Sequence, residues 1–159
     1  MHLIKPKNFV FLILPLLLAM SSCKDNCNPE KQVQQDEATI IKFLSEKNIT
    51  AQRHSTGVYY QIVNTGTGNI TFNSNTTVSV KYSGRLLSGS VFDPGAAQPI
   101  SFKLGGVIPG WQIGVPLIQK GGKIRLFIPS GLAYGCDGQG SISSNAVLDF
   151  DIELVDVTN

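Results

Sequence analysis

Cysteine is scarce in this sequence, with 3 residues among 159. That number is too small for a fold held together mainly by disulfides. Charged side chains are also few, at 15% against roughly 25% in typical soluble domains, and they form no basic stripe. These shortages exclude a charged disordered tail and a dedicated nucleic-acid binder. Hydrophobic residues make up 42% of the chain, which is enough to bury the core of one domain of this length.

The usual catalytic motifs are missing as well. His54 is the only histidine beyond the first few residues, and one histidine makes neither a Ser-His-Asp triad nor a zinc site. The sequence has no G-x-S-x-G and no Walker A motif, and the glycine-rich stretch 135–140 lacks the lysine and the strand-to-helix context of a phosphate loop. We interpret it as a turn. We therefore expect no cofactor and no metal, and the chain lacks the residues for hydrolysis, phosphoryl transfer and redox chemistry.

The longest apolar run, residues 9–20, is too short to cross a bilayer, which requires about 20 residues. Lys5 and Lys7 precede it and two serines follow, which is the pattern of a signal peptide over residues 1–22. Residues 18–23 (LAMSSC) resemble a bacterial lipobox, in which Cys23 would be acylated with diacylglycerol and become the new N-terminus. Met20 stands where leucine is usual. The alternative is a plain secretory signal cut near Ser22.

A lipid anchor implies a place in the cell envelope. We expect the outer membrane, on its periplasmic face or at the cell surface, because Lys24–Asp25 resembles the start of a surface-export tether. Without residues 1–22 the basic and the acidic side chains both number 11, so charge does not steer the protein to nucleic acid or to anionic lipid. The membrane contact would be made by the acyl chains.

Residues 23–56 are predicted to form a polar tether and a helix. Residues 30–48 contain no glycine or proline, and Val33, Ile40 and Leu44 recur at near-helical spacing. Asn28 is the expected N-cap and Pro29 the first helical residue. Two interpretations stay open: the helix packs through its C-terminal half on the domain or on a partner, or it only spaces the domain from the membrane.

From Gly57 the hydrophobic period changes to two, which predicts half-buried antiparallel strands. We expect strands over residues 57–63, 76–87, 100–104, 122–129 and 146–157. In the last of these, Leu148, Phe150, Ile152 and Leu154 alternate with a second set expected to face solvent, Asp149, Asp151 and Glu153.

A short buried helix is expected over residues 110–118, where Trp111, Val115 and Ile118 share one face. Pro116 requires this helix to end soon after it. The sequence therefore predicts an α+β fold, a curved antiparallel sheet wrapped around a short helix and preceded by an N-terminal helix.

The order of the segments near the expected loops is more specific than their composition. It runs VKYSGRL (80–86), GSVFD (89–93), FKLG (102–105), VIPGW (107–111), GGK (121–123), IP (128–129), AYG (133–135) and LDFDIEL (148–154). This succession closely resembles the FKBP (FK506-binding protein) type of peptidyl-prolyl cis-trans isomerase. The resemblance runs from about Gly57 to Val157, which assigns residues 57–159 to an FKBP-type domain.

The resemblance implies two sets of site residues. The catalytic set forms the prolyl pocket and holds the substrate carbonyl, and it consists of Tyr82, Phe92, Asp93, Trp111 and Tyr134. The substrate-binding set forms the rim and the far wall, and it consists of Ile100, Phe102, Val107, Ile108, Ile142 and Phe150. Within these sets we expect Tyr82 to donate a hydrogen bond to Asp93, because an acid beside an aromatic pocket needs a donor.

Two positions depart from the family pattern. Ile100 stands where well-known members have phenylalanine, and residues 142–145 (ISSN) replace a common Ile-Pro-Pro. We expect the segment after Tyr134 to be looser as a result.

The resemblance implies an isomerase that acts on X-Pro bonds of exported proteins. Its ligands would be proline-containing polypeptides and FK506-like macrolides. Two alternatives stay open: a chaperone-like binding module with little turnover, and a structural envelope lipoprotein that reuses the fold.

Cys27 lies in the expected tether and Cys136 in the loop after Tyr134. An exported compartment permits a disulfide. We expect both thiols to stay free, because pairing would pin a tether whose use depends on its mobility.

Overall fold

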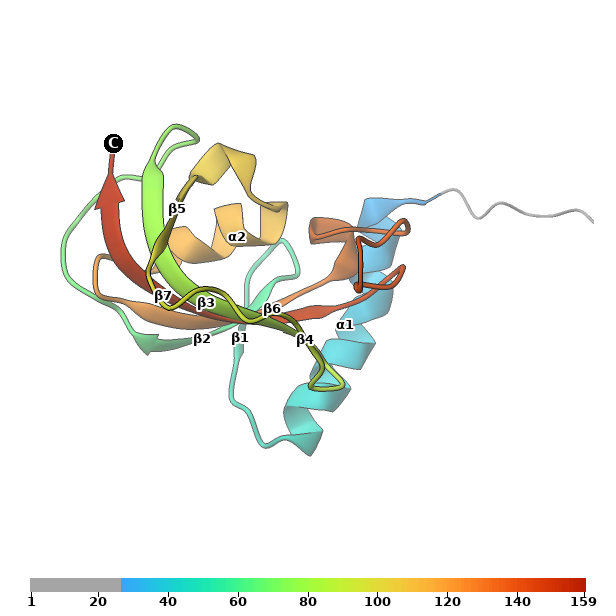
Figure 1. Ribbon diagram of the computed structural model, residues 1–159. Helices are drawn as coiled ribbons and strands as arrows, with labels where there is room; N and C mark the ends of the chain where they lie inside the picture. Colours follow the sequence, from blue (N-terminus) through green and yellow to red (C-terminus); the bar gives the residue numbers. More distant parts are fainter. Residues whose placement is uncertain (1–26) are drawn as a thin grey trace, which may run out of the picture.

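Seven antiparallel strands form one open sheet that curves around a short helix (Figure 1). The computed structural model describes residues 27–159. The strands lie in the order β1-β2-β6-β7-β3-β4, and β5 pairs with β3 beside β4. Their bounds are β1 Gln52–Arg53, β2 Tyr59–Asn64, β3 Thr77–Leu86, β4 Val91–Asp93, β5 Ile100–Lys103, β6 Lys123–Ile128 and β7 Leu148–Thr158. The helices are α1 Pro29–Glu46 and α2 Pro109–Gly114, with short 3-10 turns at Leu104–Gly106, Val115–Leu117 and Ser130–Leu132.

The α+β architecture predicted from the sequence is confirmed, with all five expected strands and both expected helices. The strands β1 and β4 were not expected. They contain two and three residues, too few for an alternating pattern to appear.

Strand β7 supplies the centre of the main core. It pairs with β3 on one side and β6 on the other, so its side chains alternate between the two faces of the sheet. Leu148, Phe150, Ile152 and Leu154 are all buried, as predicted.

The expectation that Asp149 faces solvent was wrong. Its side chain is 1% exposed. The carboxylate accepts hydrogen bonds from Arg125 at 2.9 and 2.7 Å and from Arg85 Nε at 2.8 Å. Arg85 lies directly opposite on β3, and Arg125 lies on the neighbouring β6. The Asp149 carboxylate can be buried on this outer face of the sheet because two guanidinium groups form hydrogen bonds with it.

Helix α2 packs on the concave side of the sheet. It lies so close to β6 that two of its positions have no room for a side chain. A Cβ atom at Gly114 would lie 2.5 Å from the side chain of Leu126, and one at Gly110 would collide with Ile128. These glycines weaken an isolated helix but permit the close packing. The α-helix ends at Gly114, and Pro116 lies in the 3-10 turn that follows.

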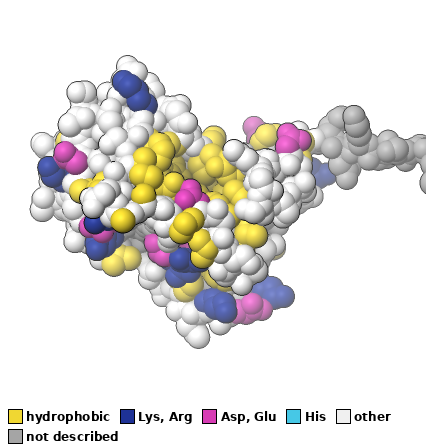
Figure 2. Space-filling view, in the orientation of Figure 1, with side chains coloured by type: hydrophobic (Ala, Val, Ile, Leu, Met, Phe, Trp, Pro, Cys, Tyr) yellow, Lys and Arg dark blue, Asp and Glu magenta, His cyan; other side chains and the backbone are white. Residues whose placement is uncertain are grey.

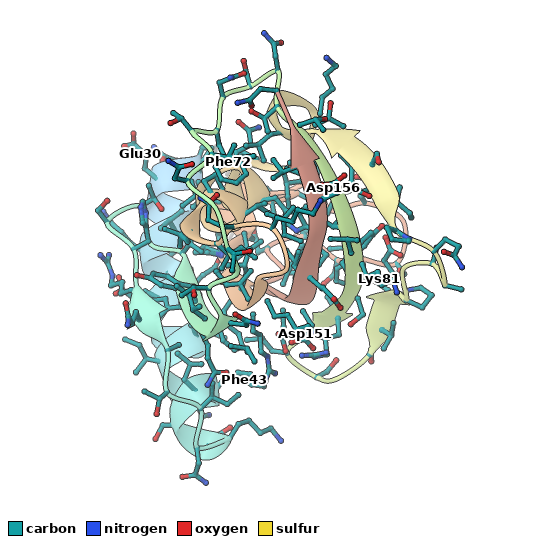
Figure 3. The ribbon with its side chains drawn as sticks, turned by 90° about the vertical axis from the view of Figure 1, so that its left-hand side faces the viewer. Glu30, Phe43, Phe72, Lys81, Asp151 and Asp156 are labelled. Carbon is teal, nitrogen blue, oxygen red and sulfur yellow. A yellow bond between two sulfur atoms is a disulfide. The ribbon has the colours of Figure 1, made fainter. Side chains whose placement is uncertain are left out.

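Helix α1 covers the outer face of the sheet at one end. Its Ile40 and Leu44 pack with Tyr59 of β2 and Phe127 of β6 in a second, smaller core. Phe43 lies on the side of α1 that faces the sheet (Figure 3), with its ring 5.9 Å from that of Phe127. The predicted cap is confirmed, because the Asn28 side chain accepts from the Lys31 N–H at 3.0 Å.

The N-terminal half of α1 also packs, which corrects the interpretation that only the C-terminal half does. Val33 lies against Gly57, and Asp36 is buried and bonded to Ser130. The helix is therefore part of the folded domain along its length.

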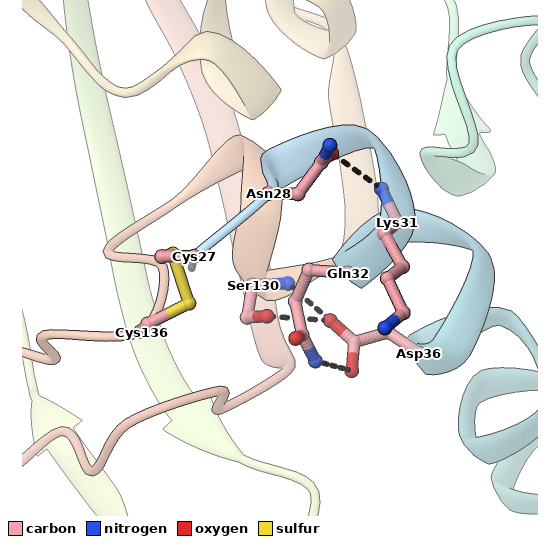
Figure 4. Close-up of a disulfide and its surroundings, with 7 residues drawn as sticks. All are labelled: Cys27, Asn28, Lys31, Gln32, Asp36, Ser130 and Cys136. Atoms are coloured by element: carbon pink, nitrogen blue, oxygen red, sulfur yellow. Dashed lines mark hydrogen bonds between the residues drawn. A yellow bond between two sulfur atoms is a disulfide. The ribbon is translucent and has the colours of Figure 1, made fainter. Parts of the chain in front are cut away.

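The expectation of two free thiols was also wrong. Cys27 and Cys136 form a disulfide, with their Cα atoms 5.8 Å apart (Figure 4). The sequence interpretation treated residue 27 as mobile, whereas it is joined directly to the end of a packed helix. The predicted signal peptide, Cys23 and Lys24–Asp25 lie outside the described residues. Within residues 27–159 no helix is both long and apolar enough to cross a membrane.

Two neighbouring isoleucines of α1 test its packing. Ile40 is 0% exposed and Ile41 is 50% exposed. We expect Ile40→Ala to lower the free energy of unfolding by about 2–5 kcal/mol, because it leaves a cavity against the sheet. The matched change Ile41→Ala should alter it by less than about 0.5 kcal/mol. Chemical denaturation measures both, and equal small effects would contradict the packing of α1.

Candidate active site

A cavity of about 340 Å³ opens beside α2 on the concave side of the sheet. In Figure 2, hydrophobic side chains gather on this face of the molecule, near α2. The walls come from β3, β4, β5, β7, α2 and the loops that follow β5 and β6. The lining residues are Tyr82, Phe92, Asp93, Phe102, Gly106, Val107, Ile108, Trp111, Tyr134, Gln139 and Phe150.

Aromatic rings form most of the cavity wall, and they pack edge to face. The Trp111 ring lies 5.0 Å from Tyr82 and 5.3 Å from Phe150, with interplanar angles of 85° in both pairs. The ring centroids of Phe92 and Phe150 lie 5.5 Å apart, with an interplanar angle of 85°. This is a preferred geometry for aromatic pairs, and it fixes the rings relative to one another.

The absence of a side chain at Gly84 makes this packing possible. A Cβ atom there would lie 2.6 Å from the Phe92 ring and 2.7 Å from the Phe150 ring. Both rings therefore occupy the space above β3 that a larger residue would fill.

Trp111 is the buried floor of the cavity, at 4% exposure. Among the described residues its Nε1–H is the one buried side-chain polar atom without a hydrogen-bond partner. Leaving a donor unsatisfied is costly. The indole is thus held by its ring contacts.

Asp93 is the acidic group of the cavity wall. Its Oδ2 accepts a hydrogen bond from the Tyr82 hydroxyl at 2.7 Å, and its Oδ1 accepts the Gly95 N–H at 2.9 Å. The donor expected from the sequence is confirmed. The bond to Gly95 also closes the turn after β4, so the same carboxylate shapes the loop and faces the cavity.

Tyr134, in the segment after β6, supplies a second hydroxyl to the cavity wall. Within residues 27–159 no hydrogen-bond partner is found for this hydroxyl, so it is available to a peptide carbonyl. Burial raises the pKa of Tyr134, and the charge of Asp93 raises it further. The group therefore stays a hydrogen-bond donor at neutral pH.

The family model for FKBP-type peptidyl-prolyl cis-trans isomerases matches residues 68–155. The chain belongs to this family. The FkpA isomerase of Escherichia coli K12 is 48% identical over 118 residues, which cover 73% of this chain and 43% of that protein. A probable FKBP-type isomerase of Haemophilus influenzae is 37% identical and covers 89% of this chain and 58% of its own length. The chain thus spans about half the length of these relatives.

Solved structures of the FKBP family share the fold. The crystal structure of Escherichia coli FkpA superposes with a TM-score of 0.69 at 41% identity, covering 82% of this chain and 62% of that one. A peptidyl-prolyl isomerase of Pseudomonas syringae pv. tomato superposes with a TM-score of 0.68 at 33% identity, covering 83% and 98%.

The structure brings together all of the FKBP site residues expected from the sequence except two. Ile100 lies on β5 opposite Val80 and does not border the cavity. Ile142 is 7% exposed and packs in the main core instead. Sequence reasoning missed Gly106 and Gln139, which do line the cavity. Gln139 lies in the glycine-rich turn, where neither periodicity nor a motif marks it.

Backbone hydrogen bonds close the segment after Tyr134. Gln139 and Ile142 exchange two backbone hydrogen bonds, at 2.9 and 2.8 Å. The Asn145 N–H donates to the Gly135 carbonyl at 2.8 Å. Backbone pairing thus closes the turn without the prolines that the family often has there.

The surroundings of Tyr82 in the cavity shift the pKa of its hydroxyl. Burial, followed by the hydrogen bond to Asp93 and its charge, raises the pKa of Tyr82 to about 12. Its neutral form is favoured by folding, so this stabilisation is complete below about pH 10, the unfolded pKa. It is lost as pH rises toward the folded pKa.

We expect Tyr82 to ionise near pH 12 in the folded protein and near pH 10 in denaturant. The difference in ultraviolet phenolate absorbance between wild type and Tyr82→Phe measures this step. A difference that appears near pH 10 under native conditions would contradict the burial of Tyr82 in the cavity and its contact with Asp93.

Proposed function

We propose that this protein is a peptidyl-prolyl cis-trans isomerase that acts on X-Pro bonds of exported proteins and assists their folding in the cell envelope. The observation that carries the proposal is one apolar cavity that combines an aromatic floor, a carboxylate and a free tyrosine hydroxyl. Trp111, Asp93 and Tyr134 supply these parts. Membership of the FKBP family supports the reaction type.

The reaction requires no bond to break. Rotation about a peptide bond has a barrier of about 18–20 kcal/mol, which comes from amide resonance. In the twisted amide that resonance is lost, and the group is less polar. An apolar cavity therefore favours the twisted state over the planar one, because it desolvates the amide before rotation.

Each residue set has a distinct role in this proposal. The proline ring rests on Trp111 between Phe92 and Phe150. Tyr134 donates to a carbonyl of the substrate and holds one side of the bond while the other turns. The Asp93 carboxylate, fixed by Tyr82, provides a negative field beside the carbonyl carbon. Oriented groups of this kind lower a barrier because they need no reorganisation during the reaction.

Two substitutions separate the field of Asp93 from simple burial. Asp93→Leu keeps a similar volume and removes the charge, so turnover should fall at least about tenfold, or about 1.4 kcal/mol, while the fold survives. Trp111→Leu shrinks the floor and should weaken binding as well as rate. A protease-coupled assay on an Ala-Leu-Pro-Phe peptide, with and without FK506, measures both. Wild-type turnover with Asp93→Leu would contradict the role of the charge.

The same assay separates the proposed enzyme from its alternatives. Turnover that FK506 blocks supports the isomerase. Binding of FK506 without turnover would identify a binding module instead. The absence of both turnover and FK506 binding would favour a structural lipoprotein.

We further propose that Cys23 is acylated and holds the protein in the outer membrane. Only three residues separate Cys23 from Cys27, which the disulfide joins to the loop at Cys136. Four residue steps span at most about 14 Å. An anchor at Cys23 would therefore hold this end of the domain close to the lipid headgroups.

Mass spectrometry of the mature N-terminus tests the anchor. We expect a lipid-modified Cys23, and Cys23→Ser should release the protein from the membrane fraction. An unmodified N-terminus in a soluble envelope fraction would refute the anchor and leave the isomerase proposal intact.

A further inference from the structure

The segment that follows β6 carries two residues of the cavity wall, Tyr134 and Gln139, and helix α1 holds this segment at two points. We propose that the N-terminal half of α1 positions residues 130–142 against the cavity. Asp36 and the Cys27–Cys136 disulfide are then positioning residues for Tyr134 and Gln139. The consequence for turnover rests on the isomerase function proposed above.

The first attachment is a buried carboxylate. Asp36 is 6% exposed, and its Oδ2 accepts from the Ser130 N–H at 2.7 Å and from the Ser130 hydroxyl at 2.6 Å (Figure 4). Its Oδ1 accepts from Gln32 at 3.1 Å. Hydrogen bonds to an ionised acceptor are about twice as strong as neutral ones. Asp36 therefore fixes the backbone where the segment begins.

Ser130 in turn restrains the backbone of the residues that follow it. Its carbonyl accepts the Ala133 N–H at 2.9 Å and the Gly135 N–H at 2.8 Å. These two donors flank Tyr134. The position of Ser130 thus sets the backbone on both sides of the tyrosine.

The second attachment lies just beyond Tyr134. Cys136 is joined to Cys27, the residue before the N-cap of α1. Between the two attachments Gly131 lies against the Pro29 carbonyl, so closely that a Cβ atom there would collide with it. The first turn of α1 and residues 130–136 therefore form one packed unit.

The ring of Tyr134 packs against the main core, but no hydrogen bond from the described residues fixes its hydroxyl. That hydroxyl has no hydrogen-bond partner found in residues 27–159, so its position depends on the backbone of Tyr134 together with the packing of the ring. Misplacing a group at the reacting centre by about 1 Å costs up to about 100-fold in rate. Loosening α1 from this segment should therefore affect turnover without removing any group from the cavity.

The same helix offers a matched control. Glu37, next to Asp36, accepts a hydrogen bond from the Tyr59 hydroxyl on β2 at 2.8 Å. Tyr59→Phe removes this one hydrogen bond between α1 and the sheet, while Glu37 keeps its two bonds from Arg53 of β1. Both attachments of α1 to residues 130–136 stay in place. A purely structural role of α1 predicts similar effects of all these changes.

The test compares three full-length variants with wild type: Asp36→Asn, the double change Cys27→Ser with Cys136→Ser, and Tyr59→Phe. Amide hydrogen exchange of residues 133–142 is measured first, because it does not depend on activity. The kcat and KM of prolyl isomerisation follow, at temperatures where each variant is folded. Quenching of Trp111, the only tryptophan, reports binding of the Ala-Leu-Pro-Phe peptide.

We expect faster exchange in residues 133–142 and a fall in kcat of about tenfold for Asp36→Asn and for the double serine variant. Tyr59→Phe should change neither. Reduction of the wild-type disulfide should reproduce the serine variant, and reoxidation should restore it.

Unchanged exchange in the first two variants, or equal effects in all three, would overturn the proposal. Faster exchange with unchanged kcat would overturn it as well. If wild type binds the peptide without turning it over, the isomerase function fails. The positioning claim is then decided by exchange and by peptide affinity.

Discussion

Strand β7 imposes the constraint on which both faces of this molecule depend. It pairs with β3 on one side and β6 on the other, so its register cannot change without breaking two ladders. Alternation then sends Phe150 into the cavity wall and Asp149 to the outer face. A slip of one residue would exchange them and place a carboxylate against Trp111. The arginine pair on the outer face opposes that slip, because a shift of one residue would carry Asp149 away from Arg85 and Arg125.

Most of the fold could be predicted because burial on one face leaves a period of two in the sequence. The cavity residues, among them Phe92, Trp111 and Tyr134, were expected because the order of the segments that contain them resembles the FKBP family. The features that were not predicted depend on partner residues that are distant in the chain. Asp149 was expected in solvent because its own strand shows only a polar position. Two arginines on other strands decide its burial, and nothing local indicates which residue lies opposite.

The same reasoning explains the errors at the N-terminal end. Cys27 was placed in a polar tether, and Asp36 in the polar N-terminal half of the predicted helix. Their partners, Cys136 and Ser130, lie 94 residues or more away. Gln139 was missed for a related reason, because a glycine-rich turn shows no periodicity from which a direction could be inferred. Short-range patterns thus identify elements, whereas long-range pairs decide how irregular segments are placed.

Those irregular segments carry the polar groups of the cavity. Trp111 and Phe150 sit on regular elements and keep their geometry through packing with one another. Asp93 and Tyr134 sit at the end of a short strand and in a loop, where packing alone is weaker. Asp93 is fixed locally, by Tyr82 and Gly95. The Tyr134 hydroxyl has no such bond among the described residues, and the turn that holds its backbone is itself attached to α1 through Asp36 and the disulfide. A site that works by holding an amide in place needs both polar groups to be rigid. The outer helix therefore belongs to the same functional unit as the cavity, although it contributes no residue to the cavity wall.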